Sequence, residues 1–114
     1  MFPEKVRPLR FKKPVVFVSA RVHPGETAAS FAMKGVIDFL TSHTDLRANL
    51  LRKMFVFMIV PMSNVYGVYH GHFRMDTEGK NLNRYYIKPS PQKQYVCIII
   101  LGLQCMLLRN WQNI

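Results

Sequence analysis

Two short apolar runs rich in β-branched and aromatic residues constrain the fold of this chain most strongly. They cover residues 14–20 and 54–60, and each has the composition of a strand that is buried on both faces of a sheet. Between them, apolar residues recur at helical spacing, which predicts a helix over residues 26–42 and a shorter one over residues 46–53. A strand, a helical crossover and a second strand favour a parallel, right-handed arrangement. The sequence therefore predicts an α/β fold.

The composition is that of a small globular protein. Of its 114 residues, 49% are hydrophobic and 19% are charged, which excludes a disordered tail. Lysine and arginine number 16 against 6 aspartates and glutamates, so the formal net charge is +10. Such a charge attracts polyanions, whether nucleic acid, anionic membrane or an acidic protein tail, and does not choose among them. Four aromatic residues are predicted to pack in the core: Phe31, Phe39, Phe55 and Phe57.

The chain divides into three parts by composition. Residues 1–13 form a basic lead-in, residues 14–91 carry the predicted domain, and residues 92–114 form an apolar tail. The longest apolar run, residues 96–108, falls short of the about 20 residues that span a bilayer, so we expect no membrane partner. The two cysteines, Cys97 and Cys105, are too few for a disulfide framework and indicate a reducing, intracellular setting.

A histidine and a glutamate flank a Pro-Gly turn directly after the first predicted strand. His23 and Glu26 can present an imidazole and a carboxylate to one point, and both groups are zinc ligands. The spacing alone is close to chance, and it fits equally a surface turn whose glutamate lies in the first turn of the helix, favoured by the helix dipole. A second candidate pair, His70 and His72, would face opposite ways in an extended segment and makes a poor metal site.

The second polar constellation lies in a long tract, residues 61–91, that we expect to be mostly loop. It contains Arg74, Asn83 and Arg84. Guanidinium groups bind carboxylates in a forked geometry and can stabilise a developing oxyanion. The same residues also suit a solvated basic loop or a loop that contacts phosphate.

Five motifs in a fixed order resemble one family. They are Ala20-Arg-Val-His-Pro-Gly-Glu-Thr27, Phe55-Val-Phe-Met-Ile-Val-Pro-Met62, Asn64-x-x-Gly-Val68, Gly71-His-Phe-Arg74 and Asn81-Leu-Asn-Arg84. Together they resemble the cytosolic carboxypeptidases, which are zinc metallocarboxypeptidases that remove glutamate from polyglutamylated proteins such as tubulin. The tract from Gly71 to Pro89 is most similar to the type-five branch, and the resemblance covers roughly residues 13–89.

The resemblance implies a role for each candidate residue. His23 and Glu26 correspond to the first two ligands of one zinc ion, and Arg74 to the arginine that polarises the scissile carbonyl. Asn83 and Arg84 correspond to the pair that holds the terminal carboxylate of the substrate. Residues 14–91 would then be the N-terminal part of a zinc carboxypeptidase catalytic domain, a mixed sheet with flanking helices. The implied location is the cytoplasm, with the nucleus and microtubules as further sites.

The sequence departs from the family pattern in two respects. Asn64-Val65-Tyr66-Gly67 stands where the family usually has Asn-Pro-Asp-Gly, which predicts an altered turn. The third zinc ligand, a histidine, and the catalytic glutamate of the family lie beyond the resemblance, and residues 92–114 contain neither histidine nor glutamate. We therefore expect these 114 residues to be catalytically inactive or nearly so.

Two other functions remain open from the sequence. One is a non-catalytic module that uses Arg74, Asn83 and Arg84 to bind acidic polyglutamate tails. The other is a nucleic-acid binder that relies on net charge, which we rank last because no nucleic-acid-binding motif is present. The sequence predicts no particular oligomeric state.

Overall fold

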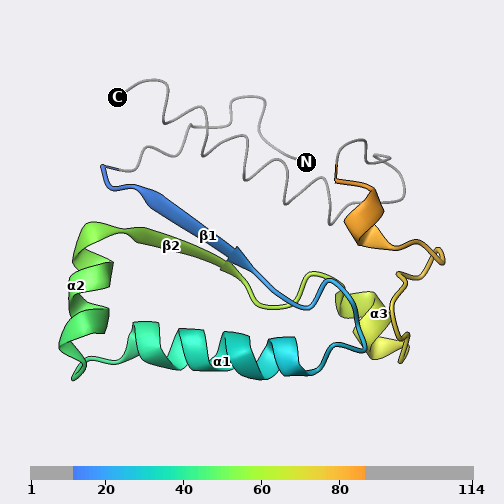
Figure 1. Ribbon diagram of the computed structural model, residues 1–114, viewed down its shortest axis with the longest axis horizontal. Coiled ribbons are helices and arrows are strands. Elements are labelled where there is room, and N and C mark those ends of the chain that lie inside the picture. Colours follow the sequence, from blue (N-terminus) through green and yellow to red (C-terminus); the bar gives the residue numbers. More distant parts are fainter. Residues whose placement is uncertain (1–11, 87–114) are drawn as a thin grey trace, which may run out of the picture.

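A computed structural model describes residues 12–86 of the chain (Figure 1). The predicted order of strand, helix, helix and strand is confirmed, and two short helical segments follow. The elements are β1 (Val15–Ser19), α1 (Ala28–Thr41), α2 (Leu46–Met54), β2 (Val56–Val60), α3 (Val65–Tyr69) and a 3-10 turn, η1 (Leu82–Arg84). The tract that we expected to be mostly loop therefore contains α3 and η1 within its described part.

The two strands pair in parallel, as predicted for a strand–helix–strand unit. Val15 of β1 is opposite Val56 of β2, and Ser19 is opposite Val60. Helix α1 runs back along one side of this pair, and α2 connects it to β2 (Figure 1). Because the carboxyl ends of parallel strands meet at one edge, the segments that follow β1 and β2 emerge side by side. The predicted α/β class is therefore confirmed.

The strands are less enclosed than the sequence indicated. All the residues of β2, and those of β1 up to Val18, are half-buried, and Ser19 is exposed. Burial of both faces of a strand needs a packed layer on each side. Helix α1 supplies only one such layer within residues 12–86, so the expectation of complete burial is wrong for this part of the chain.

Helix α1 begins later than predicted. It starts at Ala28, because the backbone is still in tight turns at Glu26 and Thr27, whose N–H groups donate to His23 O and Gly25 O at 3.2 and 2.9 Å. Glu26 therefore precedes the helix, and its expected place in the first helical turn is wrong.

Helix α2 has a clear amino-terminal cap. The Asp45 carboxylate accepts hydrogen bonds from the backbone N–H groups of Arg47 and Ala48 at 2.8 and 3.4 Å. The Arg47 side chain also donates to this carboxylate, and this bond is the main cause that lowers the pKa of Asp45 to about 2. The cap fixes where the chain turns from α1 toward β2.

The small core lies between the helices and the sheet. Met33, Leu40, Ala48 and Leu82 are its buried apolar residues within 12–86. Met33 and Leu40 are seven positions apart and share the inner face of α1, whereas Phe31 lies about 200° around the helix from Met33. Phe31 is accordingly 75% exposed, so its predicted core position is wrong. Phe39, Phe55 and Phe57 are half-buried, and the last two meet edge to face at 6.3 Å.

None of the helices within residues 12–86 combines the length and the apolar character that crossing a bilayer requires.

Two glycine substitutions test this packing in opposite directions. A Cβ at Gly35, on α1, would meet nothing within 4 Å, so Gly35→Ala should stabilise the fold by about 0.5–1 kcal/mol through helix propensity. A Cβ at Gly67 would lie 2.6 Å from both Asn64 Oδ1 and Pro24 Cγ, so Gly67→Ala should destabilise it. Urea unfolding measures both variants, and equal shifts of the midpoint would contradict the structure.

Candidate metal centre

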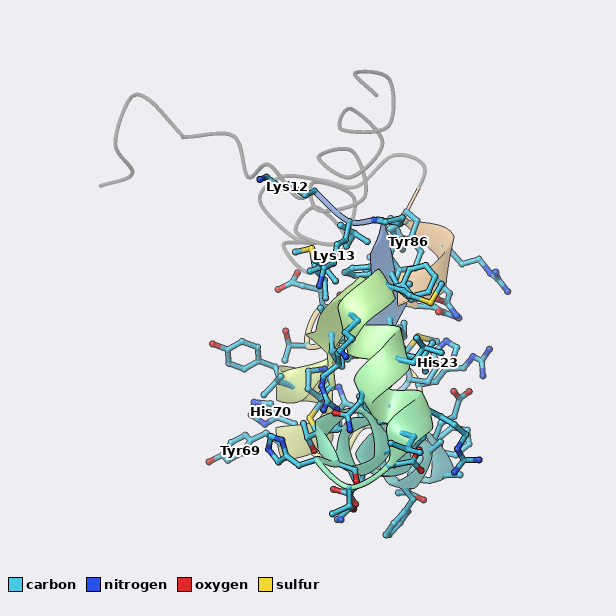
Figure 2. The ribbon with its side chains drawn as sticks, turned by 90° about the vertical axis from the view of Figure 1, so that its left-hand side faces the viewer. Lys12, Lys13, His23, Tyr69, His70 and Tyr86 are labelled. Atoms are coloured by element: carbon cyan, nitrogen blue, oxygen red, sulfur yellow. The ribbon has the colours of Figure 1, made fainter. Side chains whose placement is uncertain are left out.

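His23 lies in the segment that follows β1, and both of its ring nitrogens have oxygen partners. Its Nδ1 is 2.8 Å from Glu26 Oε1, and its Nε2 is 3.0 Å from Asn81 Oδ1. The residue is only 5% exposed, whereas the Glu26 side chain is 56% exposed. In Figure 2 His23 lies on the opposite side of the view from Tyr69 and His70. The structure therefore brings the two predicted ligands together.

The contact with Asn81 fixes the roles of the two ring nitrogens. Asn81 Oδ1 also accepts the backbone N–H of Asn83 at 3.1 Å, which identifies this atom as the amide oxygen. His23 Nε2 must therefore be the donor in its bond to Asn81. In the neutral ring the lone pair then lies on Nδ1, which faces a carboxylate oxygen of Glu26. Nδ1 and Glu26 Oε1 thus form a pair of metal-binding atoms 2.8 Å apart.

The geometry of this pair fits zinc. Two ligands of a tetrahedral zinc ion, with bonds of about 2.1 Å, lie roughly 3.4 Å apart. The present separation of 2.8 Å needs to open by only about 0.6 Å. A histidine that binds a metal commonly donates its other ring N–H to an oxygen, as His23 donates to Asn81. Residues 12–86 contain no cluster of three or more His, Cys, Asp or Glu side chains that could complete the set.

The two predicted arginines, Arg74 and Arg84, lie in different surroundings. Arg74 is near the pair, with its Nη1 3.7 Å from Glu26 Oε1 and its side chain 45% exposed. Arg84 is exposed at the end of η1, and its side chain makes no hydrogen bond or ion pair within residues 12–86. A free guanidinium is available for an incoming anion, as carboxylate binding requires.

Asn83 lies beside the candidate ligands. Its Nδ2 is 3.4 Å from His23 Nε2, longer than the 3.0 Å contact that Asn81 makes with the same nitrogen. Four of the five predicted site residues, His23, Glu26, Arg74 and Asn83, therefore form one continuous group. Arg84 lies next to it in sequence and on the same 3-10 turn.

The segment that follows β2 supports, through Asn64, the turn that carries His23 and Glu26, which we call the ligand turn. Its Nδ2 donates to Val22 O at 3.2 Å and to Met75 O at 3.3 Å, which ties together the segments that carry His23 and Arg74. Its Oδ1 accepts the N–H of Gly67 at 2.9 Å and caps α3. Asn64 and Gly67, which the sequence shares with the family pattern Asn-Pro-Asp-Gly, are thus joined by a hydrogen bond across this turn.

Two asparagines, Asn81 and Asn64, make contacts around His23 that the sequence did not indicate. Asn81 appears in the sequence only as the start of the Asn81-Leu-Asn-Arg84 motif, yet it contacts His23 across 58 positions of sequence. Asn64 was noted only as part of a motif. Their places within recognisable motifs are the only sequence signals that could have identified them, because hydrogen bonds over such separations leave no periodic pattern.

The second histidine pair is also arranged differently from the prediction. The rings of His70 and His72 lie 5.9 Å apart with a tilt of 32°, so they do not face opposite ways. The reason is Gly71, whose φ of +69° takes the backbone out of the extended conformation. His72 Nδ1 donates to Asp76 O at 3.0 Å, which leaves its Nε2 as the atom with the lone pair.

Substitution of Asn81 tests how His23 is oriented. Asn81→Ala removes the acceptor for Nε2–H and should weaken zinc binding about 10- to 100-fold. Asn81→Asp keeps an acceptor at this position and should retain the binding. Zinc titration measures the affinity, and ring ¹⁵N chemical shifts report which nitrogen carries the proton. Equal affinities of the alanine and aspartate variants would contradict this role.

Comparisons with known proteins identify the family of this chain. The sequence model for zinc carboxypeptidases matches residues 6–101. The chain is 52% identical over 94 residues to cytosolic carboxypeptidase-like protein 5 of Danio rerio, covering 80% of this chain and 11% of that protein. It is 48% identical over 89 residues to cytosolic carboxypeptidase 6 of Mus musculus, covering 78% and 16%. The chain therefore spans about a tenth to a sixth of the length of these relatives.

Solved structures show the same fold. A putative carboxypeptidase A from Shewanella denitrificans matches with a TM-score of 0.77 and 31% identity, over 80% of this chain and 24% of that one. A metallo-carboxypeptidase from Pseudomonas aeruginosa, in complex with (2-guanidinoethylmercapto)succinic acid, matches with a TM-score of 0.76 and 28% identity, over 87% and 26%. The sequence model, the relatives and the fold agree, and the chain belongs to the zinc carboxypeptidase family.

Proposed function

We propose that this chain is the N-terminal part of a zinc metallocarboxypeptidase domain of the protein deglutamylase type, and that it acts in the cytoplasm. The observation that carries the proposal is the convergence of His23 Nδ1 and Glu26 Oε1 at 2.8 Å, with the Arg74 guanidinium 3.7 Å from the same oxygen. An imidazole, a carboxylate and a guanidinium in one group suit hydrolysis of a peptide bond next to a free carboxylate.

Each residue of the group has a distinct task in this proposal. His23 and Glu26 would hold zinc, which when bound supplies a Lewis acid that polarises a carbonyl and activates water. Arg74, half exposed beside Glu26, would stabilise negative charge on the carbonyl oxygen of the substrate. Asn83 and Arg84, exposed on η1, would bind the terminal carboxylate through an amide and a forked guanidinium.

The positive charge of the chain supports an acidic substrate. A formal net charge of +10 raises the local concentration of polyglutamate chains near the protein. The two cytosolic carboxypeptidases compared above are 52% and 48% identical to this chain over the matched residues. We therefore propose polyglutamylated proteins such as tubulin as substrates of the domain to which this part belongs.

The 114 residues alone should hold only part of the catalytic site. Zinc enzymes of this type use three protein ligands, and the described residues bring two together. Beyond Glu78 the sequence contains no further histidine, aspartate or glutamate that could act as the third ligand or as a general base. We propose that this chain binds zinc weakly, binds acidic peptides through Arg74 and Arg84, and does not hydrolyse them.

Two measurements on the purified chain test this proposal. With zinc and a branched polyglutamate peptide we expect no glutamate release above a metal-free control. Binding of the same peptide should weaken about tenfold in Arg74→Ala. Lys53→Ala removes an equal charge at the exposed carboxyl end of α2 and should have a much smaller effect.

Each outcome has a clear reading. Robust release of glutamate would overturn the proposed inactivity. Equal loss of peptide binding in the Arg74 and Lys53 variants would show that net charge alone attracts the peptide. Displacement of the peptide by an oligonucleotide at a similar concentration would favour the nucleic-acid alternative.

A further inference from the structure

Arg21 has an unusual backbone conformation directly before the ligand turn. It is the only residue other than glycine with a positive φ within residues 12–86, and its φ is 55°. Side chains with a Cβ rarely adopt this conformation because of steric strain, and such strain is concentrated at functional sites. Arg21 lies two residues after the end of β1 and two residues before His23.

The guanidinium of Arg21 connects the ligand turn to helix α1. Its Nε donates to Pro24 O at 2.7 Å, and its Nη1 donates to Ser30 Oγ at 2.5 Å. Pro24 lies between His23 and Glu26, and Ser30 lies in the first turn of α1. The Arg21 side chain takes part in no ion pair within residues 12–86. Its position there is therefore set by its hydrogen bonds to these two neutral oxygens.

The backbone on either side of Arg21 is held by the segment that follows β2. Ala20 O accepts the N–H of Ser63 at 2.9 Å, and Arg21 O accepts the N–H of Asn64 at 3.1 Å. On the Glu26 side of the turn, the N–H of Gly25 donates to Phe73 O at 2.7 Å. The Arg21 side chain adds a second connection there, because it links Pro24 O to helix α1.

We propose that Arg21 is a positioning residue for the His23–Glu26 pair. Its guanidinium holds the Pro24 carbonyl against the first turn of α1 and thereby sets how Glu26 Oε1 faces His23 Nδ1. The positioning itself rests on the geometry of this chain, and its effect on metal binding rests on the proposed function. If the residue served the turn alone, glycine would serve better, because glycine adopts a positive φ without strain.

The glycine variant separates these two roles. Arg21→Gly relieves the backbone strain and removes the guanidinium, so we expect an unfolding midpoint equal to or higher than that of the parent chain. The same variant should bind zinc at least tenfold more weakly. Ser30→Ala leaves φ of residue 21 unchanged and removes one of the two anchors, and we expect it to weaken zinc binding two- to threefold.

A measurement without metal keeps this inference distinct from the proposed function. Ring ¹H–¹⁵N spectra of the metal-free chain report the His23 Nδ1 contact with Glu26, and both variants should shift the Nδ1 resonance. If the parent chain binds no zinc, the proposed function fails while the spectra still decide the role of Arg21. Unchanged spectra in both variants would overturn the inference. If the parent chain binds zinc, a zinc affinity that is the same in both variants as in the parent would overturn it too. If Arg21→Gly unfolds, Ser30→Ala gives the decisive comparison.

Discussion

The parallel pairing of β1 and β2 is the interaction on which the remaining structure depends. It continues past the strands through bonds from Ala20 N to Val60 O and from Ser63 N to Ala20 O. This extension brings the segment that carries His23 alongside the segment that begins with Asn64. Each of the contacts around the ligand turn is then within reach, including those of Asn64 with Val22 and Met75.

The paired loops bring two metal-binding atoms together at His23. One ring nitrogen donates to Asn81, and the other lies 2.8 Å from a carboxylate oxygen of Glu26. A zinc ion would be held by Nδ1 and Oε1. Arg74, 3.7 Å from the same oxygen, adds positive charge without filling the gap. We propose that this pair is a metal corner, and it has no third ligand within residues 12–86.

Sequence periodicity predicted the order of β1, α1, α2 and β2, because the type of each element follows from local spacing, but it did not indicate α3 or η1. The order of motifs also placed His23, Glu26, Arg74 and Asn83 in one site. The sequence could not predict contacts that join distant loops, such as that between Asn81 and His23. It also misplaced residues whose position depends on one backbone angle or on the exact helix face, as His70, His72 and Phe31 show.

X-ray absorption spectroscopy of the chain loaded with one equivalent of zinc tests the metal corner most directly, because it counts the imidazole, sulfur and oxygen ligands. We predict one imidazole, supplied by His23, with the remaining ligands oxygen atoms from Glu26 and solvent. The imidazole contribution should disappear in His23→Ala. A spectrum with two imidazoles, as the His70–His72 pair would supply, or with sulfur ligands, would contradict a zinc site at His23 and Glu26.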